Sequence, residues 1–416
     1  MNKILSSYLF RSSFIYALSS AVTSALPVIL MPITTRYLST QDYGVLGLFT
    51  MAITILSAFT GLSLHGAISR QFFDQENVDF ATYITNCMLV LLVSCLTFAL
   101  GVLLFSEQVQ RFLPVSGAYQ GLIILISGSQ FLITVRLVLW QMKKEPTKYL
   151  LMKIAQSIGM AGLTIFLLLK LNWGWQSQAV AQGLTFAMVA VYALFSLMRE
   201  GLLSKKLSWP YIKHALHFSL PLIPIEVGGI AIASVNSFLV AHLLGASETG
   251  IYVAGAQMGA GMLLVTSAVN KAFVPWLFEH LKANTQESKK KIVRFTYSYW
   301  LFLVLLGLLF SLLAKILVRL WVGPHFQQVA SLIPWIAFGG VFQGMYYTIC
   351  NYFHFERKTG LLAVLMMVSA VFNIGAVYFL TLEWGLVGAA AATTFSYFLC
   401  FVLNYIYCRK IIAMPW

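Results

Sequence analysis

Residues 44–66 read GVLGLFTMAITILSAFTGLSLHG, and this stretch decides the class of fold. It contains no Asp, Glu, Lys or Arg, and it is long enough to cross a bilayer, which takes roughly 20 mostly apolar residues. A helix satisfies every backbone N–H and C=O within its own segment once water is absent, so a continuous apolar run of this length predicts a membrane helix. Similar runs follow one another along the whole chain.

The composition of the 416 residues excludes an ordinary soluble globule. Hydrophobic residues make up 59% and charged residues 10%, whereas an average soluble domain carries about 25% charged residues. The net charge of +14 comes from Lys and Arg in short gaps between apolar runs, so we expect no nucleic-acid partner. The five cysteines lie in apolar runs without metal-site spacing, and we expect neither a metal nor a cofactor.

The apolar runs predict about twelve spans in two halves. We place them near residues 12–35, 44–66, 81–105, 119–141, 150–170 and 177–198, and then near residues 215–243, 250–277, 295–320, 329–351, 360–381 and 385–407. The predicted fold class is an all-α membrane protein with two six-helix lobes related by an internal repeat. The lobes comprise residues 1–198 and 214–416, and a cytoplasmic linker at residues 199–213 joins them.

Charge in the loops predicts the orientation, because Lys and Arg concentrate in cytoplasmic loops. With a cytoplasmic N-terminus, that side receives most of the 27 Lys and Arg. The opposite side receives only Arg36, Arg111, Lys170, Lys315 and Arg319. We therefore expect a multi-pass protein of the bacterial inner membrane with both termini in the cytoplasm. We interpret the first apolar run as a span, not as a cleavable signal peptide.

Two weak sequence matches indicate an internal repeat. The first aligns Leu38, Asp42 and Gly44 with Leu244, Glu248 and Gly250, and the second aligns Glu145, Trp173 and Gly174 with Glu356, Trp384 and Gly385. Both favour a parallel duplication of six spans, as in transporters that bind substrate between related halves. Chance resemblance among apolar helices is the alternative.

Polar residues inside the spans indicate where a substrate could sit, since a polar group facing lipid is costly. One stripe at helical spacing in span two comprises Thr50, Thr54, Ser57, Gly61 and His65, and one in span eight comprises Gln257, Gly261, Ala268 and Lys271. They predict a cavity shared by spans one, two, seven and eight, with His65, Gln257 and Lys271 as substrate-binding candidates. Close-packing seams are the alternative interpretation.

Glu226 is the one acid well inside a predicted span. A carboxylate there is costly unless a cation or basic partner lies near, so Glu226 is the candidate for coupling to a proton or cation. An internal ion pair is the alternative. For Lys271 the alternative is snorkelling toward the cytoplasmic interface, and for His65 it is a structural hydrogen bond.

The segment Pro32–Gly44, PITTRYLSTQDYG, resembles the signature that ends the first helix of Wzx-type polysaccharide flippases. The segment Leu220–Tyr252, with LPLIP early and LLGASETGIY late, resembles the start of their second half. The resemblance covers nearly the whole chain in length, span number and charge layout. It implies membership of the multidrug, oligosaccharidyl-lipid and polysaccharide exporter superfamily, with two six-helix lobes around a central cavity.

The resemblance also implies a function. Members of that family turn an undecaprenyl-diphosphate-linked sugar unit, such as an O-antigen unit, from the cytoplasmic to the periplasmic leaflet. Carried over residue by residue, Arg11, Arg36, Arg70 and Lys271 become candidates for binding the diphosphate or acidic sugars. A role as ordinary anchors at the membrane interface is the alternative. Many relatives have an Asp-Arg pair where this chain reads SVNSF at residues 234–238, so we do not expect that ionic contact here.

The implied partners are the lipid-linked oligosaccharide and membrane lipid, with a polysaccharide polymerase or chain-length regulator as a further partner of a monomer. We do not expect an enzyme. Three other functions remain open: a cation-coupled drug exporter of the same superfamily, a membrane enzyme of polysaccharide assembly, and a scaffold for partner enzymes. A catalyst would need an acid cluster or a large extramembrane loop, and the sequence shows neither.

Overall fold

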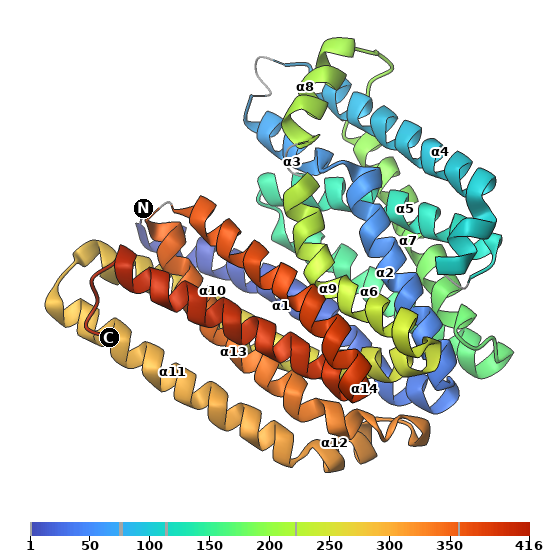
Figure 1. Ribbon diagram of the computed structural model, residues 1–416. Helices are drawn as coiled ribbons and strands as arrows, with labels where there is room; N and C mark the ends of the chain where they lie inside the picture. Colours follow the sequence, from blue (N-terminus) through green and yellow to red (C-terminus); the bar gives the residue numbers. More distant parts are fainter. Residues whose placement is uncertain (1, 75–77, 113–114, 221–222, 357) are drawn as a thin grey trace. The chain divides into compact units, whose positions relative to one another are not determined.

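The computed structural model describes the backbone of residues 2–74, 78–112, 115–220, 223–356 and 358–416. Regular structure in these residues is entirely helical, which confirms the predicted all-α class. The helices, shown in Figure 1, are α1 (Asn2–Tyr37), α2 (Thr40–Gly61), α3 (Leu64–Gln71), η1 (Phe72–Asp74), α4 (Phe80–Phe112), α5 (Gly117–Met142), α6 (Pro146–Leu171), α7 (Gln176–Arg199), α8 (Trp209–Ser219), α9 (Ile223–Leu244), α10 (Ala246–Ala283), α11 (Gln286–Leu312), α12 (Ala314–Trp321), η3 (Pro324–Phe326), α13 (Val329–Phe355) and α14 (Thr359–Ile411).

The number of long apolar helices agrees with a multi-pass membrane protein. Among the described residues, ten helices are long and apolar enough to cross a membrane. One of them, α14, has 53 residues and would be about 80 Å long if straight, more than twice the roughly 30 Å of a hydrocarbon core. α14 therefore has to contain more than one span.

Gly385 divides α14 into two spans. Its φ of 59° and ψ of −138° suit a residue without a Cβ. A Cβ added to Gly388 would overlap the carbonyl oxygen of Leu380, although eight residues of straight helix would separate the two positions by about 12 Å. The chain thus turns back at Gly385, and the two arms correspond to the spans predicted at residues 360–381 and 385–407. With the 22-residue α9, each of the twelve predicted spans has a helix.

Two predicted spans were too long. The span at residues 44–66 ends as a helix at Gly61, because Leu62 and Ser63 both adopt positive φ values (45° and 52°) that turn the chain before α3. The span at residues 295–320 divides into α11 and the short α12, with the break at Leu313. Helix α12 is amphipathic, so its apolar residues alone resembled a continuation of the span.

The chain forms two compact units. Unit 1 comprises Met1–Leu26 and Val45–Ser234, and unit 2 comprises Pro27–Gly44 and Val235–Trp416. The boundaries fall inside α1, inside α2 and inside α9, so each of these three helices contributes to both units. The lobes at residues 1–198 and 214–416, with a linker at residues 199–213, remain a prediction.

In unit 1, α5 packs against α6, α7 and α4. Leu64, Ile68 and Ile84 are fully buried where α3 and α4 meet α5, and this apolar contact holds the short α3 in place. The segment between α7 and α8 is attached to α4 through Asn86. Its Nδ2 donates to the carbonyl oxygen of Lys206 at 3.2 Å, and its Oδ1 accepts from Ser208 N at 3.0 Å.

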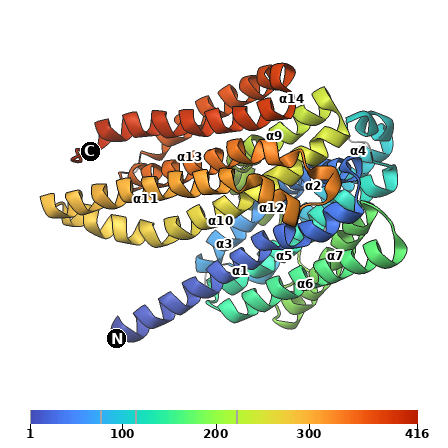
Figure 2. The same ribbon diagram turned by 90° about the horizontal axis from the view of Figure 1, so that it is seen from below.

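In unit 2, α13 lies among α10, α11 and α14, and the two views in Figures 1 and 2 agree on this arrangement. Ile349, Tyr352 and Phe353 of α13 are fully buried against these neighbours. Two glycines bring α13 close to α10, since Gly340 lies against Met262 and Gly344 against Thr266. Helix α13 is therefore the central helix of the unit.

Candidate functional site

Arg36 lies at the end of α1, on the surface of unit 2. Its guanidinium Nη2 donates to the carbonyl oxygen of Leu320, the second-last residue of α12, at 3.4 Å. One residue earlier, the buried Thr35 Oγ1 accepts from Gly323 N at 2.9 Å. These two bonds attach the end of α1 to the segment that joins α12 to η3.

A pocket of about 310 Å³ lies beside Arg36. It is lined by Arg36, Tyr37, Leu38, Ser39, Thr40 and His325. The turn that forms it is rigidly held, because Asp42 accepts from Ser39 N at 3.4 Å and from Ser39 Oγ at 2.8 Å. The pocket combines two basic side chains with hydroxyl groups, a lining that suits an anionic ligand.

The two glycines that the sequence repeat aligned contact the same pair of helix ends. A Cβ on Gly44 would overlap the carbonyl oxygen of Ala246, and a Cβ on Gly250 would overlap that of Thr40. Thr40 precedes Gly44 by four residues, as Ala246 precedes Gly250, so each helix offers a small-xxx-small motif of the kind that lets membrane helices cross closely. Thr40 Oγ1 also lies 2.6 Å from Ser247 Oγ. We call this crossing of α2 and α10 the glycine seam.

Gln257, predicted as a substrate-binding residue, lies next to the glycine seam. Its Oε1 accepts a hydrogen bond from the hydroxyl of the buried Tyr43 at 2.5 Å. Tyr43 also packs edge-on against Phe326 of η3, with ring centroids 5.3 Å apart. Arg36 and Gln257 are thus connected to the same turn, residues 37–44, within unit 2.

Lys271 lies on the exposed surface of α10, fourteen residues beyond Gln257, which corresponds to about 21 Å along the helix axis. It therefore does not join the pocket beside Arg36. Next to it in sequence, Asn270 Oδ1 accepts from Asn351 Nδ2 of α13 at 2.8 Å, which fixes this part of α10.

The predicted stripe in span two is only partly continuous. Thr50, Thr54 and Ser57 donate to backbone carbonyls of their own helix at 2.8–2.9 Å, and all three stay at least partly accessible within unit 1. His65 and Arg70 belong to the separate helix α3, where His65 is half-buried and Arg70 is exposed. The turn at Leu62–Ser63 separates them from the stripe.

Two predicted site residues have side chains outside the described residues. These are Arg11, the N-terminal candidate for the diphosphate, and Glu226, the candidate for ion coupling. The backbone around each is helical, in α1 and α9 respectively.

A buried polar network in unit 2, which includes Asn236, was not identified from the sequence. Asn236 Nδ2 donates to Thr393 Oγ1 at 2.9 Å, and its Oδ1 accepts from Asn373 Nδ2 at 2.7 Å. Ser396 Oγ donates to Asn373 Oδ1 at 2.9 Å. These bonds connect α9 to both arms of α14 through amides and hydroxyls. In an apolar interior such a network stabilises one arrangement of helices because each group is satisfied.

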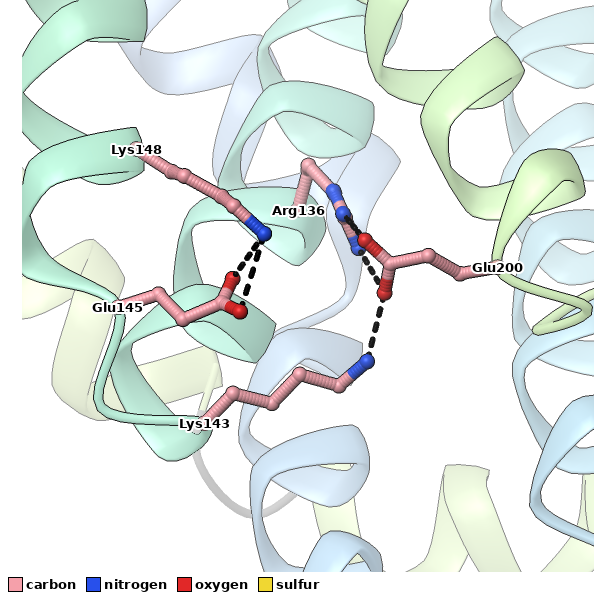
Figure 3. Close-up of polar contacts among 5 residues, drawn as sticks. All are labelled: Arg136, Lys143, Glu145, Lys148 and Glu200. Carbon is pink, nitrogen blue, oxygen red and sulfur yellow. Dashed lines mark hydrogen bonds and ion pairs between the residues drawn. The ribbon is translucent and has the colours of Figure 1, made fainter.

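Arg136, which lies within the span predicted at residues 119–141, forms a structural ion pair. Figure 3 shows its guanidinium beside the carboxylate of Glu200, which Lys143 Nζ also contacts at 2.6 Å. The Arg136 side chain is 1% exposed, and its guanidinium carbon lies 4.4 Å from the centroid of the Trp140 ring. Partial burial raises the pKa of the Glu200 carboxyl, but the hydrogen bonds from Arg136 and Lys143 outweigh it and lower that pKa to about 2.

A second pocket is wholly apolar. It has a volume of about 430 Å³ and lies between α13 and the second arm of α14, where it is lined by Pro334, Trp335, Phe338, Phe342, Thr394, Phe395 and Phe398. The described residues contain no cluster of His, Cys, Asp or Glu that could hold a metal ion. The polar groups of unit 2 that concern a ligand are therefore those at the turn after α1 and those of the network around Asn236.

The comparisons with known proteins bear on this arrangement. A family model described as "Polysaccharide biosynthesis protein" matches residues 9–281. The chain belongs to this family. A protein of Haloferax volcanii named "Probable low-salt glycan biosynthesis flippase Agl15" is 20% identical, over 91% of this chain and 79% of its own length. A membrane protein of Haemophilus influenzae is 23% identical, over 88% of this chain and 89% of its own.

Solved structures show the fold of this member of the polysaccharide biosynthesis family. An inward-facing multidrug resistance MATE family transporter of the MOP superfamily has a TM-score of 0.66 at 13% identity, covering 95% of this chain and 94% of its own. The Vibrio cholerae MATE transporter VcmN in its bent form has a TM-score of 0.59 at 11% identity, covering 98% of each chain. At these identities the likeness shows the fold alone, and it supports the predicted all-α class with two lobes. The family is one of polysaccharide biosynthesis, and the fold is shared with membrane transporters.

Proposed function

We propose that this protein moves an undecaprenyl-diphosphate-linked oligosaccharide unit from the cytoplasmic to the periplasmic leaflet. The observation that carries the proposal is the family match over residues 9–281, which includes the turn at residues 37–44, the glycine seam and Arg36. The Haloferax volcanii relative, named as a glycan biosynthesis flippase, supports a lipid-linked glycan as the substrate class.

An alternating-access mechanism is supported by α1 and the glycine seam. Helix α1 contributes to both units, and the boundary falls at Pro27, whose missing N–H leaves the helix easier to bend there. The glycine seam brings the turn between the first two spans onto α10 at what we assign as the periplasmic end. Opening of this seam would expose the periplasmic side, and its closure would seal that side.

The role proposed for each site residue follows from the charge or polarity of its side chain. Arg11, Arg36, Arg70 and Lys271 bind the diphosphate, Gln257 and His65 contact the sugars, and Glu226 couples transport to an ion. The protein acts as a monomer in the inner membrane with both termini in the cytoplasm. A polysaccharide polymerase or chain-length regulator would take over the flipped unit.

The first prediction tests this function in cells. Deletion of the protein should strand lipid-linked units on the inner leaflet and remove surface polysaccharide, and Arg36→Ala or Glu226→Gln should each lower export at least several-fold. Gel analysis of surface carbohydrate measures export, and immunoblots of membranes measure protein level. Lys170→Ala is the control, since Lys170 is an exposed basic residue predicted on the same side as Arg36. Normal export in both site variants would remove these assignments.

The second candidate is a cation-coupled drug exporter, because one solved structure with this fold is of a multidrug resistance MATE family transporter. Drug export predicts that the deletion strain becomes sensitive to cationic dyes while its surface carbohydrate stays normal. In the described part of unit 2, the buried network around Asn236 contains amides and hydroxyls and no carboxylate, which gives a cationic drug no charged partner there.

A further inference from the structure

Basic residues gather at one place on the side of the membrane where they should be scarce. Lys and Arg are normally depleted from periplasmic loops. In the proposed orientation, Arg36, Lys315 and Arg319 nevertheless lie on that side and in the same part of unit 2, because Arg36 bonds to Leu320, which directly follows Arg319. Topology does not explain this concentration of charge, but an anionic ligand would.

Helix α12 presents its charges outward. It buries Ala314 and Val318 and exposes Lys315 and Arg319, which are one turn apart. Neither Lys315 nor Arg319 has an ion pair among the described residues. Their charge is therefore available to an external anion.

The pocket beside Arg36 supplies the directed contacts. Arg36 uses one of its five N–H donors on Leu320, which leaves a fork that matches two phosphate oxygens. His325 also lines the pocket and is exposed. Helix α2 begins at Thr40 in the pocket lining, so its positive end adds to the field. Asp42 opposes an anion, but its carboxylate is engaged by Ser39.

We propose that this pocket binds the phosphate-bearing headgroup of a lipid at the periplasmic face, and so holds the flipped product before release. The inference rests on the proposed function and adds to it a product site distinct from the entry route. A volume of about 310 Å³ is at the lower end of the roughly 300–1,000 Å³ of small-molecule sites. The pocket is thus large enough for phosphate groups and part of a sugar, while the lipid tail stays in the bilayer.

The test measures binding to the full-length protein in phosphatidylcholine nanodiscs. The probes are radiolabelled undecaprenyl diphosphate and, separately, inorganic diphosphate. Arg36→Gln and His325→Gln together should weaken binding of undecaprenyl diphosphate about tenfold or more, since each removes a hydrogen bond to a charged group. Arg36→Lys should lose part of the affinity, and Lys170→Gln should lose none. Melting temperatures of the variants identify any that fail to fold.

His325→Gln alone is the decisive variant, because His325 enters no other site proposed for this protein. Wild-type affinity about tenfold or more higher for undecaprenyl diphosphate than for inorganic diphosphate, with weaker binding of the lipid in His325→Gln, supports a lipid headgroup site. Equal wild-type affinity for both probes overturns the lipid assignment in favour of a site for soluble phosphate. Unchanged binding of both probes in the double variant overturns the site altogether.

The same preparation separates this inference from the proposed function. Wild-type protein in vesicles is assayed for movement of a lipid-linked oligosaccharide across the bilayer. If the wild-type protein moves the oligosaccharide and the double variant still binds undecaprenyl diphosphate normally, the product site is rejected and the flippase function stands. Absence of movement, with binding that still depends on His325, rejects the flippase and leaves a lipid-phosphate site.

Discussion

At the scale of single residues, the ion pair between Arg136 and Glu200 should contribute to the stability of the folded protein. Breaking a buried ion pair from one side costs about 3–5 kcal/mol, because the other charge stays buried and uncompensated. We expect Glu200→Gln to lie near the lower end, since Glu200 is 29% exposed and Lys143 would no longer be held. Thermal unfolding in detergent measures the loss. Because the folded pKa of Glu200 is below its ordinary 4.5, this stabilisation is present above pH 4.5 and disappears as the pH falls toward 2.

Glu145→Gln is the matched control for Glu200→Gln. Glu145 pairs with Lys148 three residues along in the same neighbourhood, as Figure 3 shows, but Lys148 is 54% exposed. An exposed pair contributes about 0–1 kcal/mol, so this change should hardly move the melting temperature. Equal effects of the two substitutions would show that burial of Arg136 is not what makes its partner important.

The same residues show how far sequence can predict a site. Gln257 was recognisable because a polar group in an apolar run needs an explanation, and Arg36 because it lies in the motif PITTRYLSTQDYG. The partner of Arg136 was not, because Glu200 is 64 positions away and only the packing of α5 on α7 brings it near. Likewise the sequence does not predict that Asn373 and Thr393 bond to Asn236. Only the packing of both arms of α14 on α9 brings these three residues together.

At the scale of elements, Gly385 is the residue on which the hairpin of α14 depends. Gly385→Ala should destabilise the protein by about 1–3 kcal/mol, because an alanine is strained at φ 59° and ψ −138°. Gly375→Ala is the control in the first arm of the same element. An added Cβ there meets nothing within 4 Å, and alanine favours a helix interior by about 1 kcal/mol, so this change should be neutral or stabilising. Melting temperatures that fall equally in both would contradict the role of Gly385.

Long elements were predictable and short ones were not, for a physical reason. A span is fixed by the bilayer thickness and therefore appears directly in the hydropathy. Helices α3, α8 and α12 have 8 to 11 residues and are held by tertiary contacts such as those of Leu64 and Ala314. The break at Leu62–Ser63 contains neither Gly nor Pro, so its residue types do not predict a turn.

At the scale of the whole molecule, the glycine seam provides a test of alternating access. Thr40 comes from the first half of the sequence and Ser247 from the second, and their hydroxyl oxygens lie 2.6 Å apart. Replacing both with cysteine should therefore permit a disulfide, whose S–S bond is about 2.05 Å long. If the seam must open in each cycle, oxidation of Thr40→Cys/Ser247→Cys should abolish glycan movement in vesicles, and reduction should restore it.

The controls decide whether the seam moves. Each single cysteine variant and the wild type, treated with the same oxidant, should keep their activity, since four of the five native cysteines are buried and Cys95 is partly buried. A double variant that forms the disulfide completely and still transports would show that the turn at residues 37–44 travels with unit 2 throughout the cycle. In that case the opening would have to occur where a helix passes from one unit to the other, at Pro27 in α1, at Val45 in α2 or at Val235 in α9.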